Sequence, residues 1–495
     1  MTLRADAIRC AAVRKLATSA LGTARLRGAA YADARVIENR VEDVETKNGR
    51  VGRLARSGDR GIGVRVLAKG SWGFASTADL SADGVQACAA EAVAIAKASA
   101  LLAQEPVELA GREAHQATWA TPVKVDPFRV AIDRKIGDLL AVDEVLRRQK
   151  GVRVAKAYLR CTRKHQVFAS TEGALIDQVI VTTGVGYQAV AVSDDEVQVR
   201  SYPNSFRGQH MTRGYELVEE MRLLENAPRV AEEAVALLSA PQCPSGARDI
   251  VLDGSQLGLQ IHESCGHPTE LDRVLGTEAN YAGRSFLTTE KLGRFRYGSK
   301  HVNLVADATS PGGLGTFGYD DEGVPAQRWH LVKEGLFSGY LTSRETAPLV
   351  GLTASQGAMR AHSWNRIPLI RMTNISMEPG ELSQGELLAG AEGGIYFETN
   401  RSWSIDQLRY NFQFGTEVAR EIKGGKLGRL YKNATYGGIT PEFWASCDGV
   451  GEPGLWHLWG TPNCGKGQPG QLAGTGHGAS PARFRGVKVG VGYGE

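Results

Sequence analysis

Two histidines and one glutamate lie within a six-residue stretch and are of the types that hydrolytic zinc sites use. His262 and His267 can each supply an imidazole nitrogen to a metal, and Glu263 can act as the base for the metal's water. In a chain with 10 histidines, a His-Glu-x-x-x-His pattern is expected by chance at a frequency of about 0.01. The pattern therefore predicts a metal site whose third ligand lies elsewhere in the chain.

The five-residue spacing of the histidines predicts a distorted helix. Residues i and i+5 of a regular α-helix point apart, whereas a π-type turn with i→i+5 hydrogen bonds brings them to one face. Gly266 occupies position i+4, and Pro268 has no N–H to give to the carbonyl of Ser264. We expect either a bulged turn across residues 262–267 or a helix that ends at Gly266. A regular α-helix that continues through Pro268 would contradict this prediction.

A short strand and a helix must position these residues. Residues 250–252 form an apolar run that predicts a strand, and Asp253 or Ser255 can cap the helix that follows. The apolar residues of this helix recur at helical spacing and would face the core: Leu257, Ile261 and Cys265.

Length and composition indicate a globular protein of two domains. A chain of 495 residues exceeds the usual size of a single core, and its contents of 42% hydrophobic and 23% charged residues are ordinary for a soluble protein. The linker-like segment 240–246 divides the chain into predicted domains 1–240 and 241–495. A net charge of +4 with scattered basic residues does not indicate nucleic-acid binding.

Features of the chain also predict where the protein works. No apolar run is long enough to span a bilayer, and the N-terminus lacks the apolar core of a secretory signal. The 7 cysteines are irregularly spaced and include no CxxC pair, which argues against a disulfide framework. We therefore expect a cytoplasmic protein without membrane contact.

The first domain is predicted to be α/β, with long helices and an antiparallel sheet. A β-hairpin is expected over 61–77 with its turn at Lys69-Gly70, and period-two alternation predicts an antiparallel meander over 152–202. Helices are expected at these positions: 5–22, 81–102, 127–149, 213–225 and 228–239. Asn226 is the expected cap of the last helix, with Pro228 near its start.

The second domain is predicted to be β-rich, which makes the whole fold α+β. Hairpins are expected over 327–343 and 416–432, and the only strong helices expected are the metal-site helix and a short one near 384–391. Residues 446–480 are rich in glycine and have few apolar residues to bury. We expect them to form a long loop that a ligand, metal or partner holds in place.

Cys464 is the best candidate for the third zinc ligand. It is flanked by glycine and lies near Lys466, so we expect an accessible thiol whose thiolate form is favoured. A lone cysteine is more often a small buried hydrophobe, but that interpretation fits this sequence context poorly. His477 and His362 are weaker competitors for the same role.

With these segments the chain resembles the TldD/PmbA family, on its TldD side. The resemblance covers nearly the whole length and rests on these segments: 61–67, 72–77, 262–267, 319–323, 371–374 and 463–466. It implies a zinc metallopeptidase in which His262, His267 and Cys464 bind the metal and Glu263 is catalytic. The family works as dimers, which implies either a homodimer or a heterodimer with a related subunit that lacks the metal motif.

The expected reaction is hydrolysis of peptide bonds in unfolded or short peptides. Glu263 would take a proton from the metal's water and deliver it to the leaving amine. Glu270 and Asp321 are candidates to orient the imidazole N–H groups, although a solvated carboxylate or a turn residue explains each equally well. Three arginines are candidates to bind a peptide carboxylate, although ordinary ion pairs are their commoner role: Arg360, Arg366 and Arg371.

The β-rich domain suggests how a substrate is held, since an extended peptide can add to an exposed strand edge. Two other functions stay open. One is a zinc hydrolase of a non-peptide or modified-peptide amide, which a panel of such amides would separate from a peptidase. The other is a non-catalytic zinc protein whose metal fixes the glycine-rich segment or a dimer contact, which a closed four-ligand site would favour.

Overall fold

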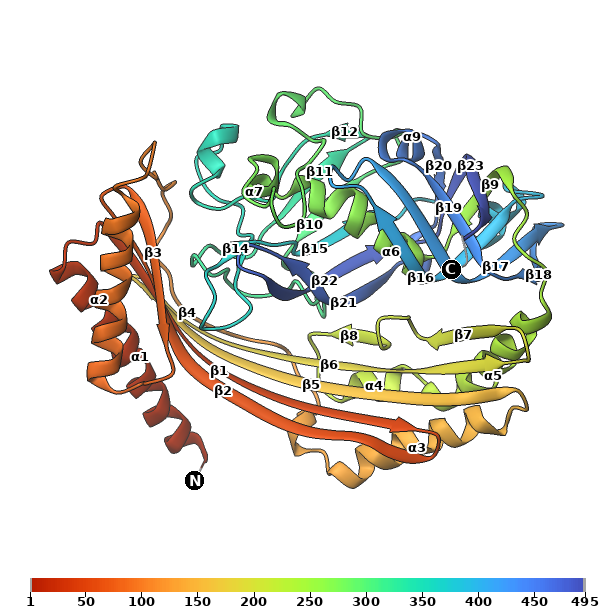
Figure 1. The fold of residues 1–495 in the computed structure, drawn as a ribbon, viewed down its shortest axis with the longest axis horizontal. Helices are drawn as coiled ribbons and strands as arrows, with labels where there is room; N and C mark the ends of the chain where they lie inside the picture. The colour runs from red at the N-terminus through yellow and green to blue at the C-terminus, as the bar shows by residue number, and fades with distance from the viewer. Residues whose placement is uncertain (1, 493–495) are drawn as a thin grey trace.

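A long, curved sheet organises the N-terminal half of the chain (Figure 1). Its strands are β1 (Tyr31–Lys47), β2 (Arg50–Ala68), β3 (Ser71–Thr77), β4 (Gln116–Ala120), β5 (Val152–Ser170), β6 (Leu175–Val192), β7 (Val197–Tyr202) and β8 (Gln209–Met211). The order is β3-β2-β1-β5-β6-β4, and β7 and β8 also pair with β6. All these pairings are antiparallel except that of β4 with β6. This computed structural model describes residues 2–492, with side-chain environments from residue 12 onward.

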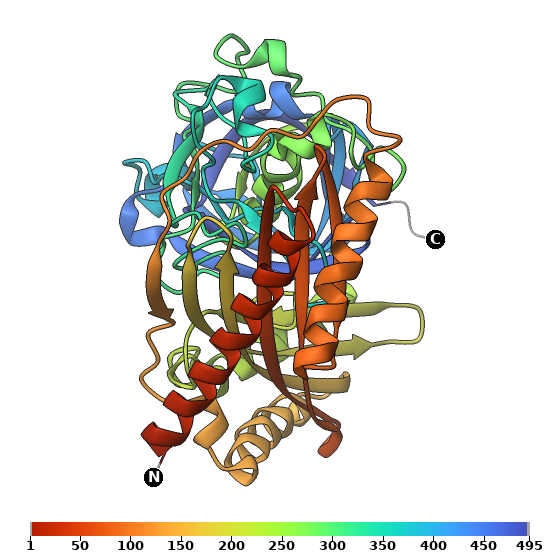
Figure 2. The same cartoon turned by 90° about the vertical axis from the view of Figure 1, so that its left-hand side faces the viewer.

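Helices cover the face of this sheet that is turned away from the C-terminal half. They are α1 (Thr2–Leu26), α2 (Ala82–Ser99), α3 (Ile132–Arg148), α4 (Glu216–Glu220) and α5 (Leu223–Ser239). Figure 2 shows α1 and α2 side by side, and their buried alanines form one core with β1, β2 and β3. α3 and α5 form a second core with β5 and β6. Small side chains allow the close approach: a Cβ on Gly73 would lie 2.1 Å from the carbonyl oxygen of Ala92.

Most of the elements predicted for this half are present. Ser81 caps α2 by accepting a hydrogen bond from the N–H of Gly84, and the β2–β3 hairpin turns at Lys69 and Gly70, both with positive φ. The predicted helix over 213–225 is wrong, because only α4 forms there. α5 begins at Leu223, so Asn226 is not its cap and Pro228 lies inside it. The apolar residues of α5 are buried from Leu223 onward. Their burial stabilises the turn of helix that precedes Pro228, so the helix begins before the proline.

The C-terminal half contains two larger sheets. One consists of β10 (Leu304–Asp307), β11 (Arg328–Lys333), β12 (Leu336–Phe337), β15 (Asn374–Met377), β21 (His457–Lys466) and β22 (Gln471–Ala479), in the order β12-β11-β10-β15-β22-β21. The other consists of β9 (Gly246–Leu252), β16 (Ile395–Ile405), β17 (Asn411–Lys423), β18 (Lys426–Tyr431), β19 (Ala434–Ile439), β20 (Cys447–Val450) and β23 (Ala482–Val491). Pairing of β16 with both β9 and β17 closes the second sheet into a ring. A separate short pair is β13 (Met359–Arg360) and β14 (Leu369–Ile370).

The helices of this half are short: α6 (Gly254–Ile261), α7 (Leu271–Val274), α8 (Gln384–Ala389) and α9 (Thr440–Ala445). α6 and α8 were expected from the sequence, whereas α7 and α9 were not. No described helix is both long and apolar enough to cross a membrane. The architecture confirms the predicted α+β fold with a β-rich C-terminal half, and the division at residue 240 stays an interpretation.

The glycine-rich segment 446–480 is not a loop, and that prediction is wrong. It folds into β20, β21 and β22, and β21 and β22 form an antiparallel hairpin. Its glycines permit close packing instead of irregular structure: a Cβ on Gly476 would lie 2.2 Å from Oδ1 of Asn374, and one on Gly478 would lie 1.8 Å from the Trp456 ring. The alternation of apolar and polar residues that usually predicts a strand is absent from this segment, because glycine stands at many of the positions that apolar residues would take.

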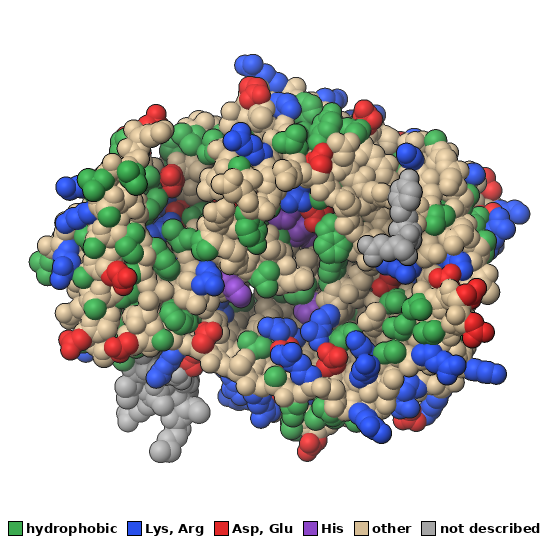
Figure 3. Space-filling view, viewed as in Figure 1, with side chains coloured by type: hydrophobic (Ala, Val, Ile, Leu, Met, Phe, Trp, Pro, Cys, Tyr) green, Lys and Arg blue, Asp and Glu red, His purple; other side chains and the backbone are tan. Residues whose placement is uncertain are grey.

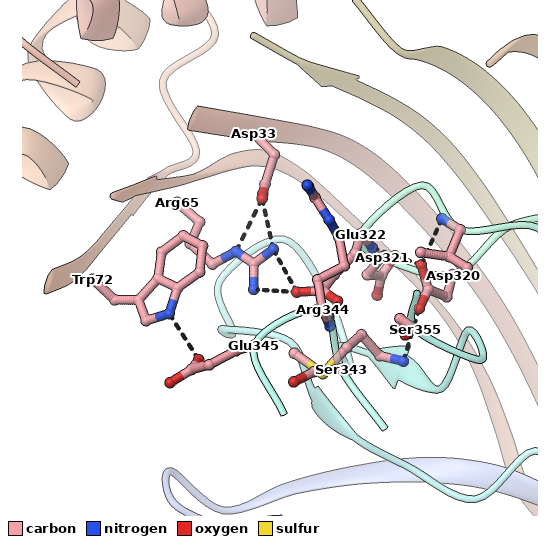
Figure 4. A network of polar contacts seen from close by, with 12 residues as sticks. Asp33, Arg65, Trp72, Asp320, Asp321, Glu322, Ser343, Arg344, Glu345 and Ser355 are labelled. Carbon is pink, nitrogen blue, oxygen red and sulfur yellow. Dashed lines mark hydrogen bonds and ion pairs between the residues drawn. The ribbon is translucent and has the colours of Figure 1, made fainter. Parts of the chain in front are cut away.

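A buried ion-pair network joins the two halves (Figure 4). The Arg65 guanidinium on β2 donates to Asp33 on β1 at 2.7 and 3.0 Å, and it also reaches Glu322 in the C-terminal half at 3.2 Å. The backbone N–H of Arg344 donates to the other oxygen of Glu322, and the Arg344 side chain binds Glu172 of the first half. Because buried charges require partners, this network fixes the long sheet against the C-terminal half.

Replacing Arg65 with methionine should destabilise the protein by about 3–5 kcal/mol, because Asp33 and Glu322 would remain buried without a countercharge. Denaturant unfolding of the full chain measures the loss. Arg53→Met is the matched control: it lies on the same strand, and its 3.8 Å pair with Asp43 has an arginine side chain that is 59% exposed. We expect a change of about 0–1 kcal/mol for this control. Equal losses in the two variants would contradict the structural role of the network.

Candidate metal centre

A π-turn at the end of α6 aligns the two histidines. Asp253 caps α6, as one of the two sequence candidates, and the helix widens into a π-helix over His262–Gly266. The N–H of His267 donates to the carbonyl of His262, which is an i→i+5 hydrogen bond. The ring centroids of the two histidines are consequently 4.9 Å apart. The predicted bulged turn is confirmed.

Neighbouring side chains satisfy the carbonyl groups that the distorted turn leaves free. Pro268 cannot donate to the carbonyl of Ser264, and the hydroxyl of Tyr297 donates to that oxygen instead, at 2.8 Å. Oγ1 of Thr269 lies 2.9 and 3.0 Å from the next two carbonyl oxygens, and its one O–H group can donate to either of them. Gly266 has no room for a side chain, since a Cβ there would lie 2.2 Å from Sδ of Met372. The turn is therefore built into the core and fixed from several sides.

The β21–β22 hairpin brings Cys464 to the histidines. The ligand atoms of His262, His267 and Cys464 all lie within 4.8 Å of one another, and all three residues are buried. Sγ of Cys464 is 3.7 Å from Nε2 of His267. Two imidazoles and a thiolate are a donor set that zinc accepts, with a fourth position left for water or substrate. The residues present thus fit a zinc ion.

The outer nitrogen of each histidine has a partner that leaves the inner nitrogen free for a metal. Nδ1 of His267 lies 2.9 Å from Oε2 of Glu270. Nδ1 of His477 can only donate to the Ile375 carbonyl, 3.1 Å away, so Nε2 of neutral His477 accepts from Nδ1–H of His262, at 2.8 Å. Burial and the neighbouring His262 hold the pKa of His477 well below its ordinary value and keep it neutral. Both histidines therefore have the tautomer that a metal ligand requires.

Glu270 is held as a carboxylate by cations on either side. Burial raises its pKa, but Lys466, His267 and Arg273 outweigh that effect and bring the pKa well below the ordinary value. Nζ of Lys466 is 3.4 Å from Oε1 of Glu270 and 2.7 Å from Asp272, and Nε of Arg273 is 3.6 Å from Oε2 of Glu270. The structure thus places Glu270 as the acceptor that orients His267.

Cys464 differs from its predicted environment in one respect. It is 4% exposed, so the predicted accessibility is wrong, because its side chain points into the core behind the hairpin. Burial raises its pKa, but His267 and Arg371 outweigh burial and lower the pKa below the ordinary value. Arg371 also donates to the Cys464 carbonyl at 2.5 Å and to that of Gln471 at 3.3 Å. The Nη1 and Nη2 groups of Arg371 therefore stabilise the β21–β22 hairpin and are not free to bind a substrate carboxylate, which is the candidate role from the sequence.

Arg409 is a site residue that the sequence analysis missed. It lies in the connection between β16 and β17 with a left-handed φ of 66°, and its Nη1 donates to Oε2 of Glu263 at 2.9 Å. Oε1 of Glu263 has no hydrogen-bond partner among the described residues. No sequence pattern marks Arg409, since it is 146 residues from Glu263 and only the fold brings the two together.

Two other predicted residues lie outside the ligand cluster. The Asp321 carboxylate accepts hydrogen bonds from Gln166 and from the N–H of Ala361, both at 2.6 Å, so its prediction as an orienter of a histidine is wrong. Its position next to Glu322 serves the contact between the two halves instead (Figure 4). His362 is exposed and does not belong to the ligand group, and the Arg366 guanidinium donates to the adjacent carbonyl of Asn365.

Comparisons with known proteins find family models and relatives that are named metallopeptidases or metalloproteases. Three family models match: the PmbA/TldA metallopeptidase domain 1 over residues 32–96, central domain over 125–240 and C-terminal domain over 245–490. A metalloprotease of Methanothermobacter thermautotrophicus is 30% identical over 93% of this chain and 95% of its own. A zinc metalloprotease TldD homologue of Saccharolobus solfataricus is 22% identical over 83% of this chain and 87% of its own. The solved structure of TldE from Thermococcus kodakarensis shares the fold, with a TM-score of 0.69, 14% identity and coverage of 95% and 98%.

Substituting His477 with phenylalanine should weaken zinc binding about 10- to 100-fold, because the Nδ1–H of His262 loses its acceptor at 2.8 Å and keeps only the longer contact of 3.4 Å to Oγ1 of Thr475. Competition with a chelating dye measures the dissociation constant. His477→Gln, whose amide oxygen can still accept, should recover part of the affinity. His362→Phe is the control, because that residue is not part of the ligand cluster and should leave zinc binding unchanged. Unaltered affinity in His477→Phe would show that the contact does not orient the ligand.

Among the cysteines whose side chains the structure describes, Cys464 is the one expected to form a thiolate below pH 9 in the metal-free protein. Burial raises the pKa of Cys88 to about 11 and those of Cys161, Cys243 and Cys447 to about 12, whereas the pKa of Cys464 is lowered. Thiolate absorbance at 240 nm, titrated from pH 6 to 10, should therefore show a transition that Cys464→Ser lacks. A difference spectrum with a midpoint at or above pH 9 would contradict this electrostatic environment.

Proposed function

The chain belongs to the TldD/PmbA metallopeptidase family, and from this membership we propose that it is a zinc-dependent peptidase acting on unfolded or short peptides. The proposal depends on one observation above all: His262, His267 and Cys464 converge in a buried cluster, and Glu263 follows the first ligand directly. A relative that is named a zinc metalloprotease supports the choice of metal.

In the proposed mechanism, a zinc ion bound by these three residues supplies Lewis acidity to a water molecule and to the peptide carbonyl. Glu263 accepts a proton from the water as its oxygen bonds to the carbonyl carbon. The same carboxyl group then delivers the proton to the leaving nitrogen as the C–N bond breaks. Arg409 binds Oε2 of Glu263 and leaves Oε1 available for this proton transfer.

Arg409 has a second proposed role, in the charge balance of the reaction. Its guanidinium lies next to Glu263, and its buried Nε has no hydrogen-bond partner among the described residues. A fixed positive charge near the reacting carbonyl stabilises the negative charge that develops on the oxygen in the transition state. We therefore assign Arg409 to two tasks: it orients the base and it supports the oxyanion.

The substrate is proposed to bind as an added strand. β21 lies at the edge of its sheet and carries Cys464, so a peptide paired along this edge would pass close to the metal ligands. The side-chain amide of Gln209 donates to the Leu458 carbonyl and accepts from the Gly460 N–H, so these two backbone groups are not available to a peptide. A peptide would therefore pair with the part of the β21 edge that is nearer to Cys464. This mode requires an extended chain and therefore favours unfolded substrates. A dimeric assembly, with an identical or a related subunit, stays a prediction.

Glu263→Gln should retain zinc but lose about 10²- to 10⁴-fold in kcat/KM on casein-derived peptides, because the proton acceptor is gone. Cys464→Ser should lose both zinc and cleavage. Metal analysis and peptide cleavage of the same preparations measure the two effects, and Glu232→Gln, an exposed carboxylate on α5, is the control. Full activity of Glu263→Gln would contradict its role as the proton acceptor, and full activity of zinc-free Cys464→Ser would point to a non-catalytic metal. Cleavage of non-peptide amides alone would identify a different hydrolase.

A further inference from the structure

A cavity of about 610 Å³ lies between the two halves, beside the ligand hairpin. One wall is the inner face of β5 and β6, and the opposite wall includes Asn463 and Ala473 of the β21–β22 hairpin. Figure 3 shows this face hollowed between the two halves, with separate histidine side chains exposed in the hollowed region. Its size is that of a site for a small molecule or a short peptide segment. The zinc ligands and Glu263 do not line it, so it is distinct from the metal centre.

Two cations at the wall of this cavity have no carboxylate oxygen within 4.0 Å among the described residues. Nζ of Lys164 makes a single contact there, a long one of 3.4 Å to the carbonyl of Ala361. The Arg360 guanidinium donates to backbone carbonyls, including that of Gly474 at 2.8 Å, and its Nε has no partner. Burial lowers the pKa of both groups, that of Arg360 to about 10 with a further contribution from Arg371. The charge of Asp321 acts on both cations from beyond 4.0 Å and partly offsets the effect of burial.

The acidic residues at the cavity wall are committed to other partners. Asp320 accepts hydrogen bonds from the backbone N–H groups of Glu322, Val324 and Met359. Oδ1 of Asp321 accepts a hydrogen bond from the Gln166 side chain, and its Oδ2 accepts one from the N–H of Ala361. Nη1 of Arg35 lies 3.6 Å from the same Oδ2. Neither carboxylate forms an ion pair within 4.0 Å of Lys164 or Arg360 in the described part of the chain. Asp321 therefore supplies negative charge at longer range, whereas the N–H donors of Lys164 make no contact with either carboxylate.

The rest of the wall suits a peptide. Apolar side chains make up much of the wall and include Ile180, Leu314 and Phe317. The side-chain amide of Asn463, directly before Cys464, faces the cavity without a hydrogen-bond partner among the described residues. Asn463 and the ligand Cys464 are consecutive residues of β21. A ligand bound to Asn463 in the cavity is therefore close to the metal centre.

We propose that this cavity binds a carboxylate of the peptide substrate, with Lys164 as its main donor and Asn463 and Arg360 in support. The inference rests on the proposed peptidase function and adds a substrate class to it. A peptide carboxylate can accept hydrogen bonds from the donors of Lys164 and Asn463 that no described residue uses fully, and the neighbouring apolar wall accommodates the side chains that precede it. The carboxylate comes either from the C-terminus of the peptide or from an acidic side chain, and the two sources share this chemistry.

Direct binding tests the proposal independently of cleavage. Full-length, zinc-loaded Glu263→Gln protein is titrated with three N-terminally labelled peptides of one sequence: a free acid, a C-terminal amide, and an amide with one internal glutamate. Fluorescence anisotropy gives the dissociation constants. We expect at least one carboxylate peptide to bind about 10-fold more tightly than the neutral amide, since an ion pair with a desolvated lysine is lost in the amide. Preference for the acid identifies the C-terminus, and preference for the glutamate peptide identifies a side chain.

Variants of Lys164 assign the effect to the cavity. Lys164→Met should reduce the preference to less than about 2-fold, and Lys164→Arg should preserve it. Lys156→Met is the matched control, on the same strand and the same face but outside the cavity, and it should behave like the parent protein. Equal binding of all three peptides, or an undiminished preference in Lys164→Met, would overturn the proposal.

The two proposals can fail separately. A protein with an intact Glu263 that cleaves no peptide but still prefers the carboxylate peptides would support the cavity assignment and contradict the peptidase. Cleavage with equal kcat/KM on the acid, amide and glutamate peptides would support the peptidase and overturn the cavity assignment. In the expected case, Lys164→Met raises KM for the carboxylate peptides about 10-fold with little change in kcat, because the residue lies away from the reacting atoms.

Discussion

One buried carboxylate connects the two parts of the metal centre. Glu270 has no contact with solvent, so it requires partners for its charge, and Lys466 and Arg273 provide the positive charge. Its Oε2 accepts from the Nδ1–H of His267 on the π-turn, and its Oε1 faces Lys466, two residues after Cys464 on β21. The carboxylate that orients one ligand therefore also holds the strand that carries another. It links two ligands that lie almost two hundred positions apart in the sequence.

The N-terminal half serves the site through its fixed position. Arg65 joins the long sheet to Glu322, and Arg200 on β7 makes a similar buried junction with Glu417 and Glu398 on β17 and β16, as well as with Glu233 on α5. Both junctions place an arginine of the first half against carboxylates of the second. The cavity between the halves keeps its shape because these charges cannot separate without exposing unpaired groups in the interior.

Local chemistry could be predicted from the sequence, and long-range partnerships could not. The π-turn follows from Gly266 and Pro268, whose effects act within a few residues, and the structure shows it as expected. The hairpin over β21 and β22 was missed because glycines conceal its alternation. Arg409 has a role only through a distant contact that no local pattern encodes. Asp321 illustrates the opposite error, since its acidity and its neighbours suggested a ligand partner while the fold uses it between the two halves.

The π-turn also limits how the spacing of the two ligands can be changed. Removing one residue between His262 and His267 would give the four-residue spacing of the common zinc helix. The residues around the turn are fitted to the present spacing: the hydroxyl of Tyr297 donates to the Ser264 carbonyl, to which Pro268 cannot donate. A deletion would therefore have to be accompanied by changes at residues that contact no metal.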